Sequence, residues 1–191
     1  IKPTPSIGGV GLIKDYKRMI SMDLKEVDNL VLIIGKTEGH IDQSLFARTI
    51  LDEKNGPPPE VNLFNEKNNG ESILNLIDKG YVKSAHDISL GGLLVAISKM
   101  CIKGNKGIKI NKSKNLINEI EYFFAEDQGR YLIEVNKEDL KEVTKILNKN
   151  SVHHEELGII TQNDMIINEK TKVTIDELKS YYTNWLSKYM S

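Results

Sequence analysis

The sequence predicts an α/β fold of the α+β type, in which a mixed β-sheet is covered by helices. Short apolar runs that end at a glycine alternate with longer segments whose apolar residues recur at helical spacing, which is typical of layered domains. The clearest apolar run is 30–35, and the clearest helical segment is 93–102. Neither an internal repeat nor a low-complexity tract is present. Residues 1–191 are therefore expected to form a single domain.

The expected strands are runs rich in apolar and β-branched residues. Residues 6–13 mix such residues with three glycines, which indicates an entry strand packed closely against its neighbour. Residues 30–34 are continuously apolar, so this strand is expected at the centre of the sheet. Strands at 157–161 and 165–167 are expected to pair as a hairpin through the turn 162–164. Further strands are expected within 81–88, 107–110, 131–135 and around 173–175.

The expected helices carry their apolar residues on one face. The segment 93–102 is apolar almost all round and is followed by Gly104, so it is expected to be the most buried helix. Leu94, Ile97 and Cys101 are its expected core residues. Further helices are expected at 44–51, 71–79, 117–125, 137–148 and from Asp176 onward, the last packing through Tyr181, Tyr182, Trp185 and Leu186.

The composition argues against several classes of protein. Lys and Arg number 26 against 27 Asp and Glu, with both signs spread along the chain, so no nucleic-acid footprint stands out. No window approaches the roughly 18 apolar residues of a membrane-spanning helix. The single cysteine cannot form an intramolecular disulfide, which fits the cytoplasm. We expect a soluble cytoplasmic protein with no nucleic-acid or membrane partner, and the first residue, Ile1, indicates a piece of a longer polypeptide.

The first candidate site lies at the start of the most buried helix and contains Asp87, Gly91 and Gly92. Glycines at a helix N-terminus let a phosphate approach backbone N–H groups, and the helix dipole favours an anion there. Asp87 is the candidate metal ligand, because a carboxylate can hold a Mg²⁺ ion that bridges to phosphate. The competing interpretation is that Asp87 or Ser89 caps the helix.

The second candidate site is the polar run 126–130, with Glu126, Asp127 and Gln128 followed by Gly129 and Arg130. Acid, amide and guanidinium groups in adjacent positions can bind a small polar ligand through several hydrogen bonds. The competing interpretation is a solvated turn between a helix and a strand, with Glu126 paired to Arg130.

Histidine and cysteine give no further candidate. We expect His40 to lie on the polar surface and His153 and His154 to lie in a solvated loop. Cys101 reads as a core residue. Because no Ser/His/Asp or Cys/His arrangement is recognisable, no catalytic residue is assigned.

Four motifs, taken in order, resemble one family. They are PTPSIGGVGLI at 3–13, GPPP at 56–59, SAHDISLGGL at 84–93 and EDQGRY at 126–131. The chain resembles the C-terminal end of the phosphoribosylformylglycinamidine synthase family over nearly its whole length. That family has two tandem copies of an aminoimidazole ribonucleotide synthetase-like unit, and this chain resembles the C-terminal α/β half of the second copy.

The resemblance implies an ATP-dependent ligase of de novo purine biosynthesis, which converts formylglycinamide ribonucleotide, glutamine-derived ammonia and ATP to formylglycinamidine ribonucleotide, ADP and phosphate. In the first copy, the counterpart of Asp87 binds Mg²⁺, and a Glu-Ser-Gln run that contacts substrate stands where this chain has 126–128. Asp127 departs from that pattern by a negative charge, which disfavours an anionic ribonucleotide. The residues expected to line a pseudo-symmetric or structural nucleotide site at one end of the sheet are Asp87, Gly91, Gly92, Glu126, Asp127 and Gln128.

The resemblance also implies partners. The N-terminal parts of the same enzyme carry the family's catalytic histidines, so the fragment alone is expected to be inactive. A glutaminase subunit and a small third subunit are expected if the enzyme is of the short form. Two alternatives stay open: a non-catalytic scaffold domain of that enzyme, and a related synthetase such as selenophosphate synthetase.

Overall fold

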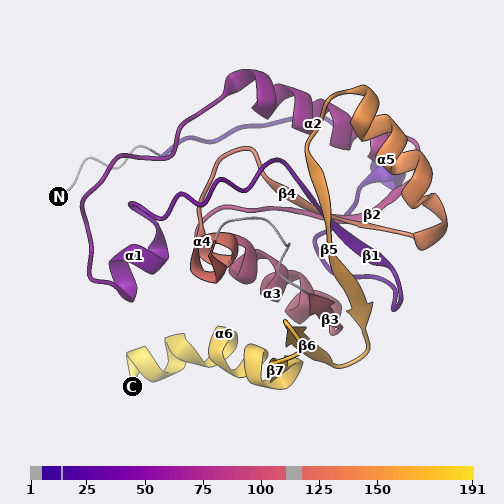
Figure 1. Ribbon diagram of the computed structural model, residues 1–191. Helices are drawn as coiled ribbons and strands as arrows, with labels where there is room; N and C mark the ends of the chain where they lie inside the picture. The colour runs from indigo at the N-terminus through magenta and orange to yellow at the C-terminus, as the bar shows by residue number, and fades with distance from the viewer. Residues whose placement is uncertain (1–5, 14, 111–117) are drawn as a thin grey trace.

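The structure, a computed structural model, describes residues 6–13, 15–110 and 118–191. These residues form a seven-stranded mixed sheet with the order β2-β4-β1-β5-β3-β6-β7 (Figure 1). The strands are β1 (Leu30–Ile34), β2 (Val82–Asp87), β3 (Gly107–Ile110), β4 (Tyr131–Val135), β5 (His154–Thr161), β6 (Asp164–Ile167) and β7 (Thr171–Thr174). The helices are η1 (Tyr16–Arg18), α1 (Leu45–Thr49), α2 (Leu63–Asp78), α3 (Gly92–Gly104), α4 (Glu119–Phe124), η2 (Lys137–Asp139), α5 (Leu140–Lys149) and α6 (Ile175–Met190).

Strand β1 lies inside the sheet, between β4 and β5, and it is antiparallel to both. Its continuous apolar run is buried on both faces, which confirms the expected central strand. Strands β3 and β4 also have the expected bounds. One parallel pair, β3 with β6, makes the sheet mixed.

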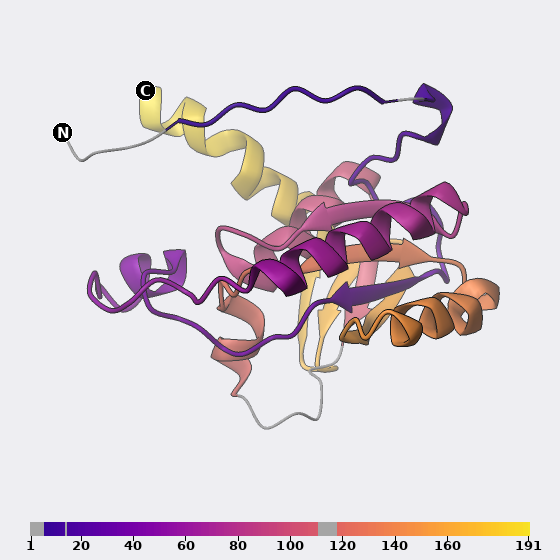
Figure 2. The same ribbon diagram turned by 90° about the horizontal axis from the view of Figure 1, so that it is seen from above.

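Two apolar clusters cover the two faces of the sheet, and Figure 2 shows the helices of both layers. Helices α3 and α4 and the first turn of α6 pack on the face that carries Val31 and Ile33. Helices α2 and α5 pack on the face that carries Leu32 and Ile34. Helix α3 is the buried helix that the sequence predicts: Ile97 and Cys101 are fully buried, and Leu94 packs against the same cluster.

The entry strand expected at 6–13 is wrong. These residues form neither helix nor strand, and Ile7, Val10 and Leu12 are exposed. Residues 3–5 of the same motif lie outside the described ranges, as do Asn111 to Ile117, where a helix was expected to begin at 117. β-branched residues favour an extended backbone, but they do not supply a pairing partner for it.

The hairpin expected between 157–161 and 165–167 is also wrong. Strand β3 lies between β5 and β6, so the short turn joins two strands that are not neighbours. A Cβ atom on Gly107 would lie 2.0 Å from the carbonyl oxygen of Asp164, so glycine is required where β3 meets the start of β6. Only a long-range contact decides this pairing.

Two helices differ from the expectation. Helix α2 begins at Leu63 rather than at 71, capped by the Asn62 side chain. Helix α6 buries Ile175, but the packing face expected there is wrong, because all four of its residues are exposed: Tyr181, Tyr182, Trp185 and Leu186. Beyond its first turns α6 runs past the body of the domain (Figure 1). In the described ranges, none of the helices has the length and apolarity of a membrane span.

Candidate functional site

The polar run 126–130 forms the turn between α4 and β4. The Ile88 N–H donates a hydrogen bond to the Arg130 carbonyl at 2.9 Å, and Asp87 is paired with Tyr131 across β2 and β4. The two candidate sites therefore lie at the same end of the sheet. The turn also touches the loop that follows β1, so it joins three segments that are far apart in the sequence.

Glu126 connects the starts of two helices. Its Oε1 accepts hydrogen bonds from the backbone N–H of Leu45, which opens α1, at 2.7 Å and from that of Gly91, which precedes α3, at 2.8 Å. Helix N-termini attract anions because their first N–H groups lack partners and because the helix dipole is positive there. The Glu126 carboxylate thus occupies an anion position at the N-terminus of α3.

Asp127 organises the loop after β1. Its carboxylate accepts three consecutive backbone N–H groups, from Glu38 at 3.0 Å, Gly39 at 3.1 Å and His40 at 3.0 Å. The Gly39 φ of +92° lets the loop curl so that the three N–H groups converge. Such a concave set of N–H groups is an anion-binding nest. Asp127 fills this nest and is only 7% exposed.

Arg130 completes the turn from inside the domain. Its buried guanidinium donates to the Ala125 carbonyl at 2.6 Å and to the Thr37 hydroxyl at 3.1 Å, and it lies 3.8 Å from an Asp127 carboxylate oxygen. Burial lowers the pKa of Arg130, while the Asp127 charge opposes that shift. The ion pair of Arg130 is therefore with Asp127, not with Glu126 as the turn interpretation expected.

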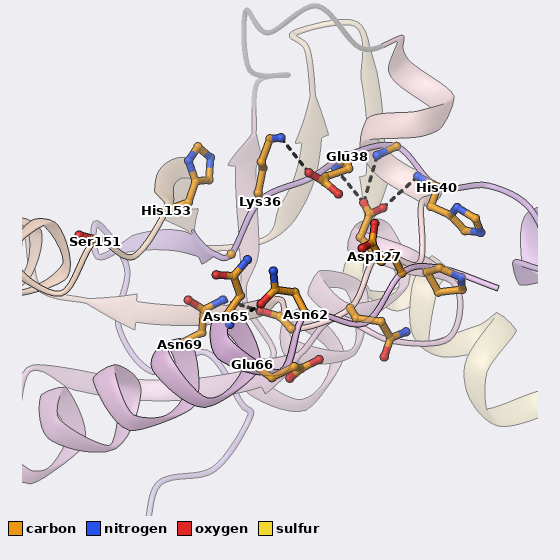
Figure 3. A pocket seen from close by; sticks show the side chains of 16 residues that line it. Lys36, Glu38, His40, Asn62, Asn65, Glu66, Asn69, Asp127, Ser151 and His153 are labelled. Carbon is orange, nitrogen blue, oxygen red and sulfur yellow. Dashed lines mark hydrogen bonds and ion pairs between the residues drawn. The ribbon is translucent and has the colours of Figure 1, made fainter. Parts of the chain in front are cut away.

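A polar cavity of about 670 Å³ opens beside this turn. Its floor and walls come from the loop after β1, the first turns of α2, the turn itself and the segment before β5. Figure 3 shows Asn62, Asn65 and Asn69 on the side of α2 that borders the cavity, with Lys36 and Asp127 on other sides. The side chains that line it and carry charge or hydrogen-bonding groups are Lys36, Glu38, His40, Glu60, Asn62, Asn65, Glu66, Asn69, Asp127, Gln128, Ser151 and His153.

Lys36 and Glu38 form an ion pair at the edge of this cavity. The Lys36 ammonium lies 2.8 Å from a Glu38 carboxylate oxygen, and this hydrogen bond raises the pKa of Lys36. Both side chains are more than half exposed, so the pair adds little to stability. It leaves a lysine ammonium at the cavity mouth.

Asp87 lies at the end of β2 with a side chain that is 57% exposed. His86 Nδ1 is 3.0 Å from an Asp87 carboxylate oxygen. Burial acts to raise the pKa of Asp87, but hydrogen bonds from Ser89 and His86 and the His86 charge together lower it. Among the described residues, no group of three or more His, Cys, Asp and Glu side chains is arranged to hold a metal ion. At the end of β2, the described residues therefore present a single accessible carboxylate to a metal ion, that of Asp87.

The glycine pair before α3 serves close packing. Gly91 and Gly92 have φ values of +88° and +71°, which favour glycine. A Cβ atom on Gly92 would lie 2.7 Å from the carbonyl carbon of Phe124, at the end of α4. The pair lets α3 start directly against α4, and the Gly91 N–H is engaged by Glu126.

The structure brings all six predicted site residues to one end of the sheet, but only Asp127 and Gln128 line the cavity. His40, expected as polar surface, and His153, expected in a solvated loop, both line the cavity. The loop expectation is wrong for His154, which begins β5 and pairs with Ile34. The asparagines of α2 were not among the predicted site residues. A signal was present, because Asn62, Asn65 and Asn69 follow helical spacing. It was overlooked because the helix was expected to begin only at 71.

The domain combines a mixed sheet, a buried helix that begins at a glycine pair, and an acidic turn. This combination matches a known class of domain. The chain belongs to the family described as AIR synthase related protein, C-terminal domain, whose model matches residues 26–168. Over its whole length it is 67% identical to phosphoribosylformylglycinamidine synthase subunit PurL of Pelagibacter ubique and 36% identical to the subunit of the same name from Bartonella henselae. The chain spans 26% of the length of each of these relatives.

Solved structures share the fold. Thermotoga maritima PurL complexed with FGAR superposes with a TM-score of 0.70 at 18% identity, covering 85% of this chain and 30% of that one. Thiamine-monophosphate kinase from Stenotrophomonas maltophilia superposes with a TM-score of 0.53 at 11% identity, covering 78% of this chain and 52% of the kinase. At these identities the likeness shows the fold alone.

Proposed function

We propose that this chain is one domain, 1–191, of a PurL-type phosphoribosylformylglycinamidine synthase: the C-terminal domain of the second aminoimidazole ribonucleotide synthetase-like unit. The observation that carries the proposal is the 67% identity over the whole chain to the PurL subunit of P. ubique. The complete enzyme would use ATP and glutamine-derived ammonia to convert formylglycinamide ribonucleotide to formylglycinamidine ribonucleotide, ADP and phosphate. The same identity favours this enzyme over the selenophosphate synthetase alternative.

Within that enzyme we assign this domain a supporting role and no catalytic residue. The carboxylates of Glu126 and Asp127 together accept five hydrogen bonds from backbone N–H groups of their own chain. A carboxylate held in this way is a poor general base, because its lone pairs are already engaged. This observation supports the scaffold alternative for the turn 126–130.

We propose ATP and Mg²⁺ as ligands of the complete enzyme, with Asp87 as one metal ligand. PurL structures of T. maritima are described as complexes with ATP, ADP and AMPPCP. Mg²⁺ binds through one or two carboxylates together with phosphate oxygens and water, so a single accessible carboxylate fits that chemistry. A phosphate near Gly91 would have to share its N–H with Glu126 or displace the Glu126 carboxylate.

The proposed partners are the N-terminal parts of the same polypeptide, a glutaminase subunit and a small third subunit. One T. maritima structure with this fold is described as PurLQS, a name that indicates an assembly of several subunits. The balanced charge of this chain gives no reason to add a nucleic-acid or membrane partner, and we propose a cytoplasmic location for the enzyme.

The test compares the full-length protein that carries this chain with the fragment 1–191. Each is purified and assayed for formylglycinamidine ribonucleotide formation from formylglycinamide ribonucleotide, ATP and ammonium. We expect product from the full-length protein and none from the fragment, because catalysis needs all groups positioned together. A full-length protein that makes selenophosphate instead would overturn the assignment, and an active fragment would overturn the supporting role.

A further inference from the structure

The loop after β1 contains an anion site that the chain itself fills. Three consecutive backbone N–H groups converge on one carboxylate, that of Asp127, at 3.0 to 3.1 Å. A nest of this kind can also bind the oxygens of a phosphate, because its N–H groups point toward one position and accept any anion that fits there. What occupies it is decided by the side chain at position 127.

Two cations lie near the nest, although Glu38, Glu60 and Glu66 also line the adjoining cavity. The buried Arg130 guanidinium lies 3.8 Å from Asp127, with its side chain fully shielded from solvent. Lys36 lines the adjoining cavity, where its ammonium is paired with Glu38. Without the Asp127 charge, a buried cation and three N–H groups would lack their counter-charge, which is an expensive arrangement in a protein interior.

The nest is within reach of the solvent-connected cavity. Glu38, Gly39, His40 and Asp127 all line it, together with Lys36. Its volume of about 670 Å³ is far larger than an inorganic phosphate ion needs. A phosphate that entered the cavity would therefore meet the nest if the carboxylate were absent.

From this geometry we propose that Asp127 is a specificity-determining residue, an internal anion that holds the oxyanion site at 38–40 and excludes phosphate groups from it. In the native protein the cavity rejects a phosphoryl group at this wall and accepts neutral or cationic polar groups. The inference concerns the cavity itself and does not depend on which reaction the complete protein catalyses.

The experiment measures inorganic phosphate binding to the full-length protein by calorimetry and by the phosphate dependence of thermal unfolding. Two variants open the nest: Asp127→Ala removes charge and volume, and Asp127→Ser leaves a small hydroxyl. Two variants are matched controls. Asp127→Asn removes the charge but keeps the volume, and Glu66→Gln removes one negative charge from the same cavity without touching the nest.

We expect the opening variants to gain a phosphate site at least about tenfold tighter than any at this position in the native protein, so that phosphate raises their unfolding temperature. A crystal structure of Asp127→Ser grown in phosphate should show the anion on the N–H groups of 38–40. Neither control should gain a phosphate site, and Asp127→Asn should be less stable than the native protein because its neutral amide does not balance the Arg130 charge.

Three results would overturn the proposal. The first is a folded opening variant with no gain in phosphate affinity. The second is an equal gain in Asp127→Asn or Glu66→Gln, which would assign the effect to overall charge. The third is that both opening variants stay unfolded even in excess phosphate, because an open nest should then be refilled and the fold restored.

Discussion

The Gly91 backbone N–H donates a hydrogen bond to the Glu126 carboxylate at 2.8 Å. The N-terminus of α3, the position that the sequence offers to a ligand phosphate, is thereby bound to an anion from the same chain. The same carboxylate oxygen accepts from Leu45, so this one side chain also fixes the start of α1 against α3.

Replacing Glu126 should destabilise the domain. Glu126→Ala leaves the N–H groups of Leu45 and Gly91 without their acceptor, and each unsatisfied buried donor costs about 1–3 kcal/mol. We expect a loss of free energy of unfolding of at least about that size, because Gly91 is buried and Leu45 is partly buried. Glu126→Gln keeps an acceptor oxygen and should lose less. Urea unfolding checks this, and equal losses in the two variants would show that the acceptor is not what matters.

The glycine pair before α3 should tolerate no side chain. Gly92→Ala adds a Cβ atom 2.7 Å from the Phe124 carbonyl carbon and forces alanine to a φ of +71°. Gly80→Ala is the matched control, since Gly80 has a φ of +78° with open space around its Cβ position. The control should lose about 1–2 kcal/mol from the left-handed backbone alone, and Gly92→Ala should lose clearly more. If thermal unfolding shows the same loss in both, the α3–α4 contact is not tight.

Asp23 should make stability depend on acid pH. Hydrogen bonds from Lys25 and Ser21 lower the pKa of Asp23 below its ordinary value of 3.8. A lowered pKa in the folded state means that the charged carboxylate stabilises the fold above pH 3.8. That contribution is lost as the pH falls from this value through the lower folded pKa. The free-energy difference between native protein and Asp23→Asn should therefore be present at pH 7 and shrink below about pH 4.

A constant difference between these two proteins from pH 7 to pH 3 would contradict the assignment. Glu169 offers a comparison on the exposed surface, because its hydrogen bond to Lys109 also lowers its pKa. Glu169→Gln should follow the same direction with a smaller effect, since a solvated pair contributes little.

Asp87 should matter more for nucleotide retention than for chemistry in the full-length enzyme. Asp87→Ala removes the carboxylate proposed to bind Mg²⁺, so we expect loss of bound nucleotide or a lower unfolding temperature, with a smaller change in the rate of the chemical step. Asp78→Ala, which removes an exposed carboxylate at the end of α2, is the control. Nucleotide content after gel filtration and single-turnover rates measure the two effects. A large loss of turnover with nucleotide content and folding unchanged would place this domain directly in catalysis.

Local sequence patterns correctly predicted the elements whose burial depends on residues close together in the sequence. Strand β1 is a continuous apolar run and helix α3 is apolar on nearly all sides, so each must be buried whatever packs against it. Both predictions were confirmed. The order and wording of the four motifs led to the family without any knowledge of the fold. The acidic turn 126–130 was also recognised as important, though its partners were not.

Tertiary structure decided what the sequence left open, because those features depend on contacts between distant segments. Asp127 and Glu38 are 89 positions apart, and no local pattern indicates that one would bind the other. The insertion of β3 between β5 and β6 follows from long-range pairing, not from the turn that joins them. The aromatic stripe of α6 looked like a core face, since periodicity shows that a helix has an apolar side but not whether anything covers it.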